Sequence, residues 1–415
     1  MIKKAIMKLS TVLSNIVTAI KSLFYGRRKD IVLFGAWFGD KFSDNSRFLF
    51  QYLSDNKEKH GLSHVVWVTR DEKTCKTLEG MGYEVYMMDS EESKYYHKKA
   101  KTHIICNCSS YKSAKLPDIL TEYSYGAKRI NLWHGVGVIK GVGCASLEYK
   151  KKKEAHRFVY ACKELLERLA VYRLFAMEKG GWGSFKFLST TPAATYQFAQ
   201  FSYVPKKNFI ESAYPRTCEC PKLTPDEEKV VKIIESSKNT VLYLPTFRTG
   251  DNKFDFTTVA DSLKDTLQKN DILFIQKAHS ASAVSTEYVL EGNVLSLSPD
   301  FDINVIIPKI TMLITDYSSA MSDAAFFHKP VLLYVPDFEE YVNGDNGVTD
   351  EAEELMNGPK FYNITELAEG IERYIASPDS AKPECYEAVR EKYWGKERTL
   401  EEIWTDIETS IGLKK

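Results

Sequence analysis

Several short motifs in this sequence carry side chains suited to chemistry on a phosphate ester. His134 stands in Asn131-Leu-Trp-His-Gly-Val-Gly137, where an apolar run enters a glycine-rich turn. A histidine can take a proton from an attacking hydroxyl near neutral pH. Gly135 and Gly137 would let a ligand approach the backbone closely. The alternative interpretation is a core histidine bonded to a neighbouring carbonyl, and the pattern alone leaves both open.

Positively charged side chains end two other apolar runs. Arg248 closes Tyr243-Leu-Pro-Thr-Phe-Arg248, and its planar guanidinium suits bidentate binding of phosphate. Lys277 and His279 end the next run and lie two residues apart, hence on one face of an extended segment. Each cation alone is typical of an ordinary surface. Together they predict a pocket for the phosphates of a donor.

A further run, Leu313-Ile-Thr-Asp-Tyr-Ser-Ser319, leads into a predicted helix. Ser318 and Ser319 can cap that helix, whose first N–H groups and positive dipole end attract anions. Asp316 stands in the same turn, and Asp323 follows Ser319 by four residues on the same face. We expect this helix start to bind phosphate without a metal. Plain helix capping is compatible with the same residues.

The elements that must position these motifs alternate between short β-rich runs and helical patterns. Such alternation is typical of parallel sheets covered on both faces. The predicted strands are Ile31–Gly35, His64–Thr69, His103–Asn107, Arg129–Trp133, Phe185–Ser189, Asn208–Ser212, Thr240–Pro245, Ile272–Lys277, Asn293–Leu297, Met312–Thr315 and Val331–Val335. They predict an α/β protein with two doubly wound, Rossmann-type lobes facing a central cleft. Ligands of such sheets bind at the carboxyl ends of the strands, so we expect the site in that cleft.

The length of 415 residues fits two domains of roughly 200 residues each. The periodicity breaks at Pro215–Pro225, which indicates a boundary. We predict an N-terminal, acceptor-side lobe over 30–217 with a possible helical insertion over 149–183. A donor-binding lobe is predicted over 218–380, and C-terminal helices over 381–415.

Residues 1–29 have the pattern of a basic amphipathic helix. Apolar residues recur at helical spacing, and seven basic residues flank them. The charge-free stretch Leu9–Ile20 is too short to span a bilayer. The pattern predicts a cytoplasmic protein lying peripherally on the anionic inner face of the cell membrane. A helix packed on the N-terminal lobe is the alternative. For the insertion, contact with membrane or polymer and a solvated face are equally compatible.

Composition and missing motifs exclude several classes of protein. Lysine plus arginine and aspartate plus glutamate both number 56, which argues against bulk nucleic-acid binding. The eight cysteines are scattered without zinc-site spacing and favour reduced, buried thiols. No P-loop, nucleophile elbow or early G-x-G-x-x-G is present. We predict neither a metal nor a cofactor.

In their order along the chain, these stretches resemble the CDP-glycerol glycerophosphotransferase family, the polymerases and primases of teichoic acids and related bacterial capsules. The resemblance covers most of residues 31 to about 360. Its segments are Phe42-Ser-Asp-Asn-Ser-Arg47, Leu132-Trp-His-Gly135, Tyr214-Pro-Arg216, Pro245-Thr-Phe-Arg248, Lys277-Ala-His279, Asp302-Ile-Asn304, Leu313-Ile-Thr-Asp-Tyr-Ser-Ser319 and Asp337-Phe-Glu-Glu-Tyr341. The combination is specific, although no single segment is.

The resemblance implies a GT-B-like fold and transfer of glycerol phosphate, or a related polyol phosphate, with release of CMP. The donor would be CDP-glycerol or CDP-ribitol, and the acceptor a hydroxyl of a polymer or a lipid-linked primer. The family's catalytic histidine falls on His134, and its pyrophosphate-binding histidine falls on His279. The expected donor-binding residues are Arg248, Lys277, His279, Asp316, Ser318, Ser319 and Asp323. On the acceptor side we expect Asp44, Asn45, Arg47 and Gly135, with Arg216 and Asn304 as further candidates.

Departures from the family pattern leave the polyol and the acceptor open. Val136-Gly137 stands where Thr-Pro is usual, and Thr249, Ala278 and Ala213 replace the usual Asp, Pro and Gly. One alternative function is a GT-B glycosyltransferase that uses a nucleotide sugar. Another is an inactive membrane scaffold of a capsule-assembly complex, which the intact His134 and phosphate-binding positions disfavour.

Overall fold

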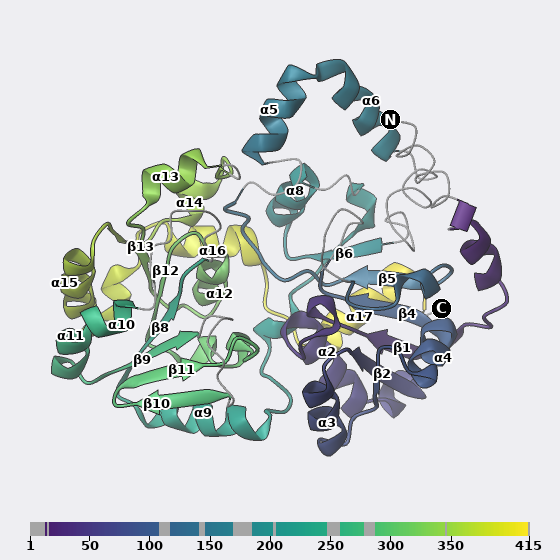
Figure 1. Cartoon of the computed structure of the whole chain (residues 1–415), viewed down its shortest axis with the longest axis horizontal. Helices are drawn as coiled ribbons and strands as arrows, with labels where there is room; N and C mark the ends of the chain where they lie inside the picture. The colour runs from purple at the N-terminus through teal and green to yellow at the C-terminus, as the bar shows by residue number, and fades with distance from the viewer. Residues whose placement is uncertain are drawn as a thin grey trace. The chain divides into compact units, whose positions relative to one another are not determined.

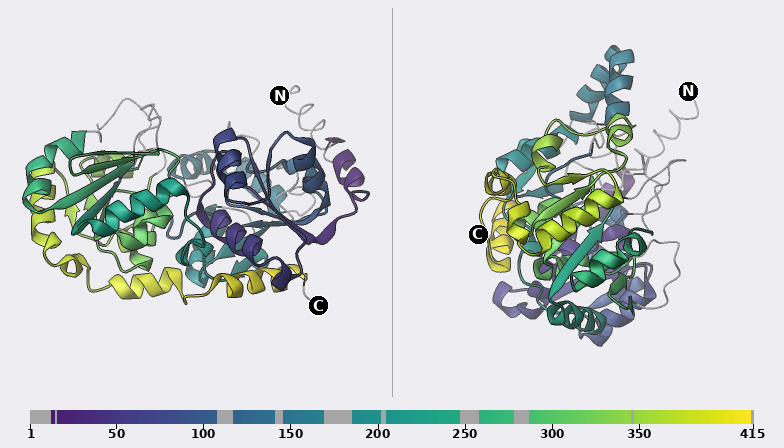
Figure 2. Two further views of the ribbon diagram at one scale, coloured as in Figure 1. Left: turned by 90° about the horizontal axis from the view of Figure 1, so that it is seen from below. Right: turned by 90° about the vertical axis from the view of Figure 1, so that its left-hand side faces the viewer.

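The computed structural model describes residues 13–14, 16–107, 117–140, 146–168, 185–201, 205–246, 258–277, 287–344 and 347–413. Contacts divide the chain into two units, whose elements are labelled in Figure 1 and seen from two further sides in Figure 2. We call residues 1–134, 153–222 and 397–415 the N-terminal unit, and residues 135–152 and 223–396 the C-terminal unit.

A parallel sheet of seven strands forms the centre of the N-terminal unit, in the order β3-β2-β1-β4-β5-β6-β7. The strands are β1 (Arg28–Phe34), β2 (His64–Thr69), β3 (Val85–Met87), β4 (Ala100–Ile105), β5 (Lys128–Asn131), β6 (Phe185–Ser189) and β7 (Phe209–Glu211). The central strands are continuous apolar runs because helices cover both faces of such a sheet; Ile31 to Phe34 are fully buried. The order reverses direction between β1 and β4, which is where doubly wound folds bind ligands.

The described part of this unit also contains the helices α2 (Asp44–Asp55), α3 (Glu72–Gly80), α4 (Glu91–Lys99), α6 (Arg157–Arg168), α8 (Pro192–Phe201) and α17 (Leu400–Ile411). Their starts follow from capping side chains: Asp71 accepts from the backbone N–H of Thr74, and Thr399 forms a capping box with Glu402. Helix α5 (Leu147–Ala155) crosses the division between the units.

The C-terminal unit has a second seven-stranded sheet, in the order β10-β11-β9-β8-β12-β13-β14. Its strands are β8 (Asn239–Leu244), β9 (Ile272–Lys277), β10 (Tyr288–Glu291), β11 (Val294–Leu297), β12 (Met312–Thr315), β13 (Val331–Tyr334) and β14 (Lys360–Phe361). Only the pairing of β10 with β11 is antiparallel. That hairpin turns through two residues, and Gly292 supplies the positive φ that hairpin turns require. The core holds Val241, Phe274, Ile314 and Leu332, all fully buried.

The helices described in the C-terminal unit are α9 (Pro225–Ser236), α10 (Val259–Ser262), α11 (Lys264–Lys269), α12 (Ala320–Phe326), α13 (Phe338–Asn343), α14 (Ala352–Leu355), α15 (Ile364–Ile375) and α16 (Tyr386–Trp394). Thr224 and Glu227 form a capping box at the start of α9, with Pro225 in the first turn. Helix α16 packs on α12, and the indole N–H of Trp394 donates to the carbonyl of Ser322 at 2.6 Å.

The predicted α/β class with two doubly wound lobes is confirmed, and every predicted strand is present. Three strands were not predicted: β3, β10 and β14 have only two to four residues each and lie at or next to sheet edges. Such short runs carry too little periodicity to be recognised.

The range 381–415, for which C-terminal helices were predicted, contains α16 and α17. Helix α16 groups with the C-terminal unit, whereas α17 groups with the N-terminal unit. Helix α17 contacts α2 and β7, and its apolar stripe includes Ile403 and Ile407, which are fully buried. The boundary between the lobes was predicted between residues 217 and 218, and the contacts divide the chain between residues 222 and 223. Of the predicted insertion, residues 169–183 lie outside the described residues.

Candidate active site

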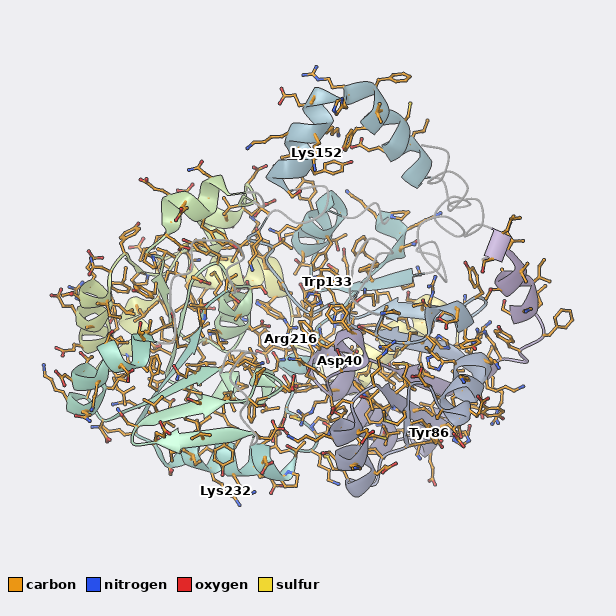
Figure 3. All side chains as sticks on the ribbon, viewed as in Figure 1. Asp40, Tyr86, Trp133, Lys152, Arg216 and Lys232 are labelled. Atoms are coloured by element: carbon orange, nitrogen blue, oxygen red, sulfur yellow. The ribbon has the colours of Figure 1, made fainter. Side chains whose placement is uncertain are left out.

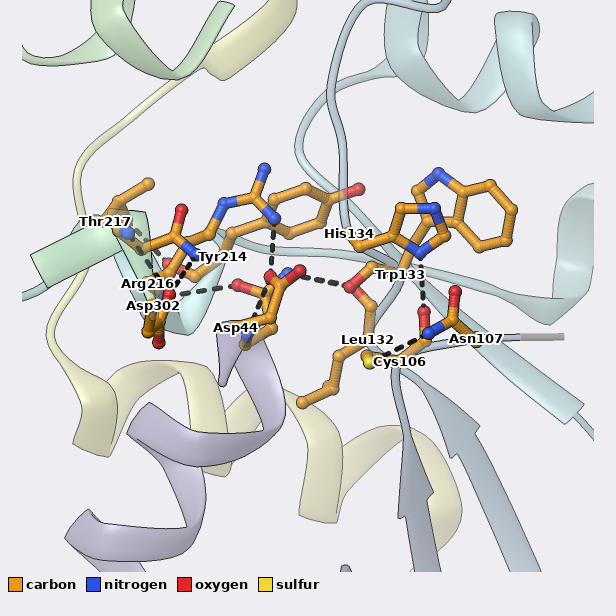
Figure 4. A network of polar contacts seen from close by, with 12 residues as sticks. Asp44, Cys106, Asn107, Leu132, Trp133, His134, Tyr214, Arg216, Thr217 and Asp302 are labelled. Atoms are coloured by element: carbon orange, nitrogen blue, oxygen red, sulfur yellow. Dashed lines mark hydrogen bonds and ion pairs between the residues drawn. The ribbon is translucent and has the colours of Figure 1, made fainter. Parts of the chain in front are cut away.

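The loop after β5 places His134, and two amide side chains fix that loop. Asn131 accepts from the backbone N–H of Trp133 at 2.7 Å. Asn45, at the start of α2, donates its side-chain amide to the carbonyls of Trp133 at 2.9 Å and Leu132 at 3.3 Å (Figure 4). The peptide immediately before His134 is therefore tied to both β5 and α2.

The imidazole of His134 has a defined orientation. Its Nδ1 lies 2.9 Å from the carbonyl oxygen of Cys106 (Figure 4). A carbonyl only accepts hydrogen bonds, so Nδ1 carries the hydrogen and Nε2 of the neutral ring keeps its lone pair. The indole of Trp133 stacks on the ring with centroids 4.3 Å apart, and that of Trp37 lies at 5.1 Å. The alternative interpretation of His134 was a core histidine bonded to a neighbouring carbonyl. The carbonyl bond is present, but the His134 side chain is only half-buried.

Backbone strain concentrates around His134. Among the described residues, six non-glycine residues have a positive φ, and four of them belong to this cluster: Trp37, Phe38, Asp44 and Trp133, with φ between 44° and 66°. Each such residue costs roughly 1–3 kcal/mol, and strain of this kind gathers at functional sites. The strain supports the assignment of a site here independently of the histidine.

The other predicted residues of this unit are buried and bonded to protein. Arg216 pairs with Asp44 (Nη1 to Oδ1, 2.6 Å), with both side chains at most 4% exposed, and its backbone N–H donates to Asn45. Figure 3 labels Arg216 and Trp133, the two residues that Asn45 connects. Arg47 is fully buried and donates to the carbonyl of Lys222 at 3.2 Å. These bonds shape the loop, and contact with an acceptor stays a prediction.

Sequence reasoning missed several residues around His134. The buried carboxylate of Asp118 accepts from the backbone N–H groups of Phe38, Cys106 and Asn107, at 2.7, 2.9 and 2.8 Å. Burial raises the pKa of Asp118 to about 6, against the opposing effect of these bonds. Trp37 follows one predicted strand and Asn107 ends another, so their place at strand ends was a signal that was available. Asp118 lies in a loop outside any motif, so nothing marked it.

In the C-terminal unit, Asp316 ties two strand ends together. Its two carboxylate oxygens lie 2.8 and 2.9 Å from the backbone nitrogen of Thr246, which donates to them, and Tyr317 donates its N–H as well. The hydroxyl of Thr315 donates to the carbonyl of Leu244 at 2.6 Å. The ends of β8 and β12 are thereby fixed to each other. Arg248 and His279 lie outside the described residues.

The start of α12 is only partly as predicted. Ser318 accepts from the backbone N–H of Ala320 at 3.3 Å, whereas Ser319 makes no side-chain capping bond. Asp323 is buried within the helix. The backbone at Gly135 passes so near Ser319 that a Cβ there would lie 3.2 Å from the serine hydroxyl. Gly135 therefore permits a close approach to its backbone, and in this structure the Ser319 side chain makes that approach.

The remaining predicted residues of this unit also have protein partners. Lys277 ends β9 and donates its ammonium to the carbonyl of Phe301 at 3.0 Å. The side-chain amide of Asn304 donates to Asp302 at 2.7 Å. Because β8, β9 and β12 are parallel neighbours, their carboxyl ends place Lys277, Thr246 and Asp316 along one sheet edge. Within the described ranges, no group of three or more His, Cys, Asp or Glu side chains is arranged to hold a metal ion.

Comparison with known proteins agrees with this arrangement. A family model described as CDP-glycerol:poly(glycerophosphate) glycerophosphotransferase matches residues 18–397. The chain belongs to this family. A teichoic acid poly(glycerol phosphate) polymerase of Bacillus spizizenii is 26% identical over 84% of each chain. A teichoic acid glycerol-phosphate transferase of Staphylococcus aureus is 23% identical over 90% of each.

A solved structure of a variant of the wall teichoic acid polymerase TagF has the same fold. Its TM-score is 0.68 at 16% identity, over 99% of this chain and 97% of that one. The predicted family, the GT-B-like fold and the enzyme class are thus confirmed: this member of the glycerophosphotransferase family is a transferase with a CDP-glycerol donor.

Proposed function

We propose that the chain transfers glycerol phosphate from CDP-glycerol to a hydroxyl of a teichoic-acid-type polymer or its lipid-linked primer, with His134 as the general base. The family supports the donor and the reaction. The observation that carries the role of His134 is the bond of its Nδ1 to the Cys106 carbonyl. That bond leaves the proton-accepting lone pair on Nε2.

The chemistry asks for one proton acceptor and for charge stabilisation. The acceptor oxygen attacks the phosphorus that bears glycerol, the bond from that phosphorus to the CMP oxygen breaks, and CMP leaves with the electron pair. Nε2 of His134 takes the proton of the attacking hydroxyl. Phosphoryl transfer needs positioning and electrostatics more than covalent help from the protein. An imidazole whose Nδ1 bonds the Cys106 carbonyl and whose ring lies against the indoles of Trp133 and Trp37 suits this role.

We propose that the donor phosphates bind at the strand ends of the C-terminal unit. Arg248, Lys277 and His279 would supply positive charge and hydrogen bonds. Asp316 would act differently from our first expectation. A carboxylate repels phosphate, and this one already accepts from Thr246, two residues before Arg248. We therefore infer that Asp316 positions the segment that leads to Arg248, while Ser318, Ser319 and Asp323 remain candidates around it.

A peripheral place on the inner face of the cell membrane is the third part of the proposal. Residues 16–22 are helical, and Leu13, Ile16, Val17 and Ile20 are 37–56% exposed. Helix α6 also exposes Phe158, Val159 and Leu165, following the basic run 150–153 in α5. Exposed apolar stripes beside basic residues favour an anionic lipid surface. None of the described helices has the length and apolarity needed to cross a bilayer.

CDP-ribitol is the second candidate donor. A teichoic acid ribitol-phosphate primase of Bacillus spizizenii is 26% identical over 44% of this chain and 49% of its own. Incubation with CDP-glycerol and with CDP-ribitol, each with a lipid-linked acceptor, distinguishes the donors when the product mass is measured. Release of CMP from either donor supports the reaction class. Release of UDP or GDP from a nucleotide sugar instead would contradict it.

Replacement of His134 tests the proposed base. His134→Gln and His134→Ala should lose roughly 10²–10⁴-fold in turnover, the range for a positioned base. Both should bind CDP-glycerol about as tightly as the wild type in calorimetry, because the base acts on the acceptor. His60→Gln is the matched control, since His60 is also half-buried in the N-terminal unit and bonds to Tyr52. Near-normal turnover in a folded His134→Gln protein would refute the assignment.

A further inference from the structure

Asp118 and His134 bind opposite ends of one peptide group. The amide that joins Cys106 to Asn107 donates its N–H to the carboxylate of Asp118 at 2.8 Å. The carbonyl of the same amide accepts from Nδ1 of His134 at 2.9 Å (Figure 4 draws the histidine end). We propose that Asp118 is a positioning residue for His134, and that it holds and polarises the imidazole through this single peptide group.

The physical effect follows from the order of the bonds. A hydrogen bond to an ionised carboxylate is shorter and about twice as strong as a neutral one. Withdrawing the amide hydrogen shifts electron density to the carbonyl oxygen, which then accepts more strongly from Nδ1. This hydrogen bond from Nδ1 stabilises the imidazole most once Nε2 has taken a proton, because the ring is then positively charged. A carboxylate bonded directly to a catalytic histidine fixes its tautomer and stabilises its charge. Here a peptide lies between them.

The same carboxylate also fixes the aromatic wall beside the imidazole. Its second oxygen accepts from the backbone N–H of Phe38 at 2.7 Å. Trp37, whose indole lies against His134, is the preceding residue. The guanidinium of Arg70 donates to the carbonyls of Phe38 and Pro117. One buried carboxylate thus joins the loops after β1 and β4 beneath the histidine.

The backbone makes room for Asp118 at one particular glycine. A Cβ at Gly35 would overlap the carbonyl oxygen of Asp118 and the side chain of Ile119. Only glycine at the end of β1 lets the 117–119 loop come so near the sheet. Asp118 itself is 2% exposed. The packing of the 117–119 loop against the end of β1 therefore determines the position of the carboxylate.

Burial and the neighbouring ionisable groups both affect the ionisation of Asp118. Burial raises its pKa to about 6, so a carboxyl charged at neutral pH occupies a site where charge is unfavourable. The ionisable groups around it are the Arg70 guanidinium, the Cys106 thiol, His97, which accepts from the backbone of Leu120, and His134 itself. Strongly shifted groups next to a proposed base are typical of active sites.

Asp118→Asn tests the inference, which rests on the proposed role of His134 as base. The substitution keeps the shape and removes the charge. We expect kcat, followed by CMP release, to fall on the order of tenfold, with an unchanged KM for CDP-glycerol. Asp71→Asn is the control, because Asp71 also accepts from a backbone N–H but caps α3 instead. In the His134→Ala background, Asp118→Asn should cause no further loss.

Three outcomes decide between the inference and its alternatives. Unchanged kcat in a folded Asp118→Asn protein overturns it, and so does an equal loss with and without His134. Spectra of ¹⁵N-labelled histidine give a readout that does not depend on activity. We expect the His134 signals, identified by their loss in His134→Ala, to show the Nδ1–H tautomer in the wild type and a mixture in Asp118→Asn. Identical spectra overturn the inference. Should His134→Ala keep its turnover, the proposed base fails, and these spectra alone decide the role of Asp118.

Discussion

The pH dependence of stability gives the sharpest quantitative test of the region around His134. Burial raises the pKa of Asp118 from the ordinary 3.8 to about 6 in the folded chain. Between these values the folded state holds a proton that the unfolded state has lost. Linkage then requires the contribution of Asp118 to the free energy of unfolding to be fully present below about pH 4 and to fall as the pH rises through about 6. A difference of about two units corresponds to about 3 kcal/mol.

Asp118→Asn removes this titration. The amide of the variant cannot ionise, so position 118 loses no proton at any pH. Its free energy of unfolding relative to wild type should therefore rise by about 3 kcal/mol between about pH 4 and pH 7. The same substitution should slow catalysis at neutral pH. A charged Asp118 that costs stability at neutral pH but supports catalysis is the trade-off expected of a functional site.

Urea unfolding followed by tryptophan fluorescence measures this difference. Of the described tryptophans, Trp37, Trp67, Trp133 and Trp404 belong to the N-terminal unit, and only Trp394 belongs to the other. The signal thus reports mainly the unit that contains Asp118, which matters because two units need not unfold together. Asp30→Asn is the control.

In this control, the pH dependence of the free energy of unfolding has the opposite sign and lies in a different pH range. A hydrogen bond from Arg28 lowers the pKa of Asp30 to about 2. Its contribution to stability is therefore lost only as the pH falls from about 4 through about 2, and the control should be flat above that range. A difference for Asp118→Asn that is flat or falls between about pH 4 and pH 7 would refute the reasoning.

Three further predictions concern the ion pair, the donor pocket and the N-terminal helix. Asp44→Ala should lower the free energy of unfolding of the N-terminal unit by about 3–5 kcal/mol in urea, because it leaves the charge of Arg216 buried and unpaired; a loss below about 1 kcal/mol would contradict this. Lys277→Ala should weaken CDP-glycerol binding roughly tenfold or more in calorimetry, the equivalent of one hydrogen bond to a charged group, and wild-type affinity would mean that the pocket is misplaced. Deletion of residues 1–24 should release the protein from anionic vesicles in a pelleting assay and leave activity on a soluble acceptor largely intact, whereas pelleting that neither the deletion nor raised salt changes would count against membrane binding. The deletion stops before Arg27, whose guanidinium donates to backbone carbonyls of His97, Ala100, Tyr123 and Tyr125.

The sheets were predictable from sequence because both are largely parallel and buried. Predicted strands such as Ile31–Gly35 or Met312–Thr315 are short apolar runs bounded by polar residues, and helical patterns separate them. What escaped prediction depends on contacts between distant segments. Helix α17 belongs with α2 and β7 because of the shape of its apolar face, and no local pattern names the partner of such a face.

The candidate site was predictable to the extent that it lies at strand ends. In a parallel sheet all carboxyl ends meet at one edge, so polar residues after separate strands become neighbours. This rule led to the prediction of His134, Lys277 and Asp316, which the structure places at strand ends or in the loops that follow them. It could not find Asp118, which follows no strand and acts on its surroundings only through backbone N–H groups. Every residue except proline has a backbone N–H group, so the sequence does not show which residues such a side chain binds.

The same limit explains why Asp44 and Asn45 were predicted on the acceptor side. Their place in a family motif marks them as important but does not separate contact with a ligand from support of the loop. The structure adds their protein partners, and contact with an acceptor stays a prediction. Asn45 donates to the carbonyl of Trp133 and accepts from the backbone of Arg216, so it holds the histidine loop from the side of α2. Asp118 holds the Cys106–Asn107 peptide from the other side. Two polar side chains thus act on main-chain groups next to His134: Asn45 on the carbonyl of the preceding residue, and Asp118 on the peptide whose carbonyl accepts from Nδ1 of the imidazole.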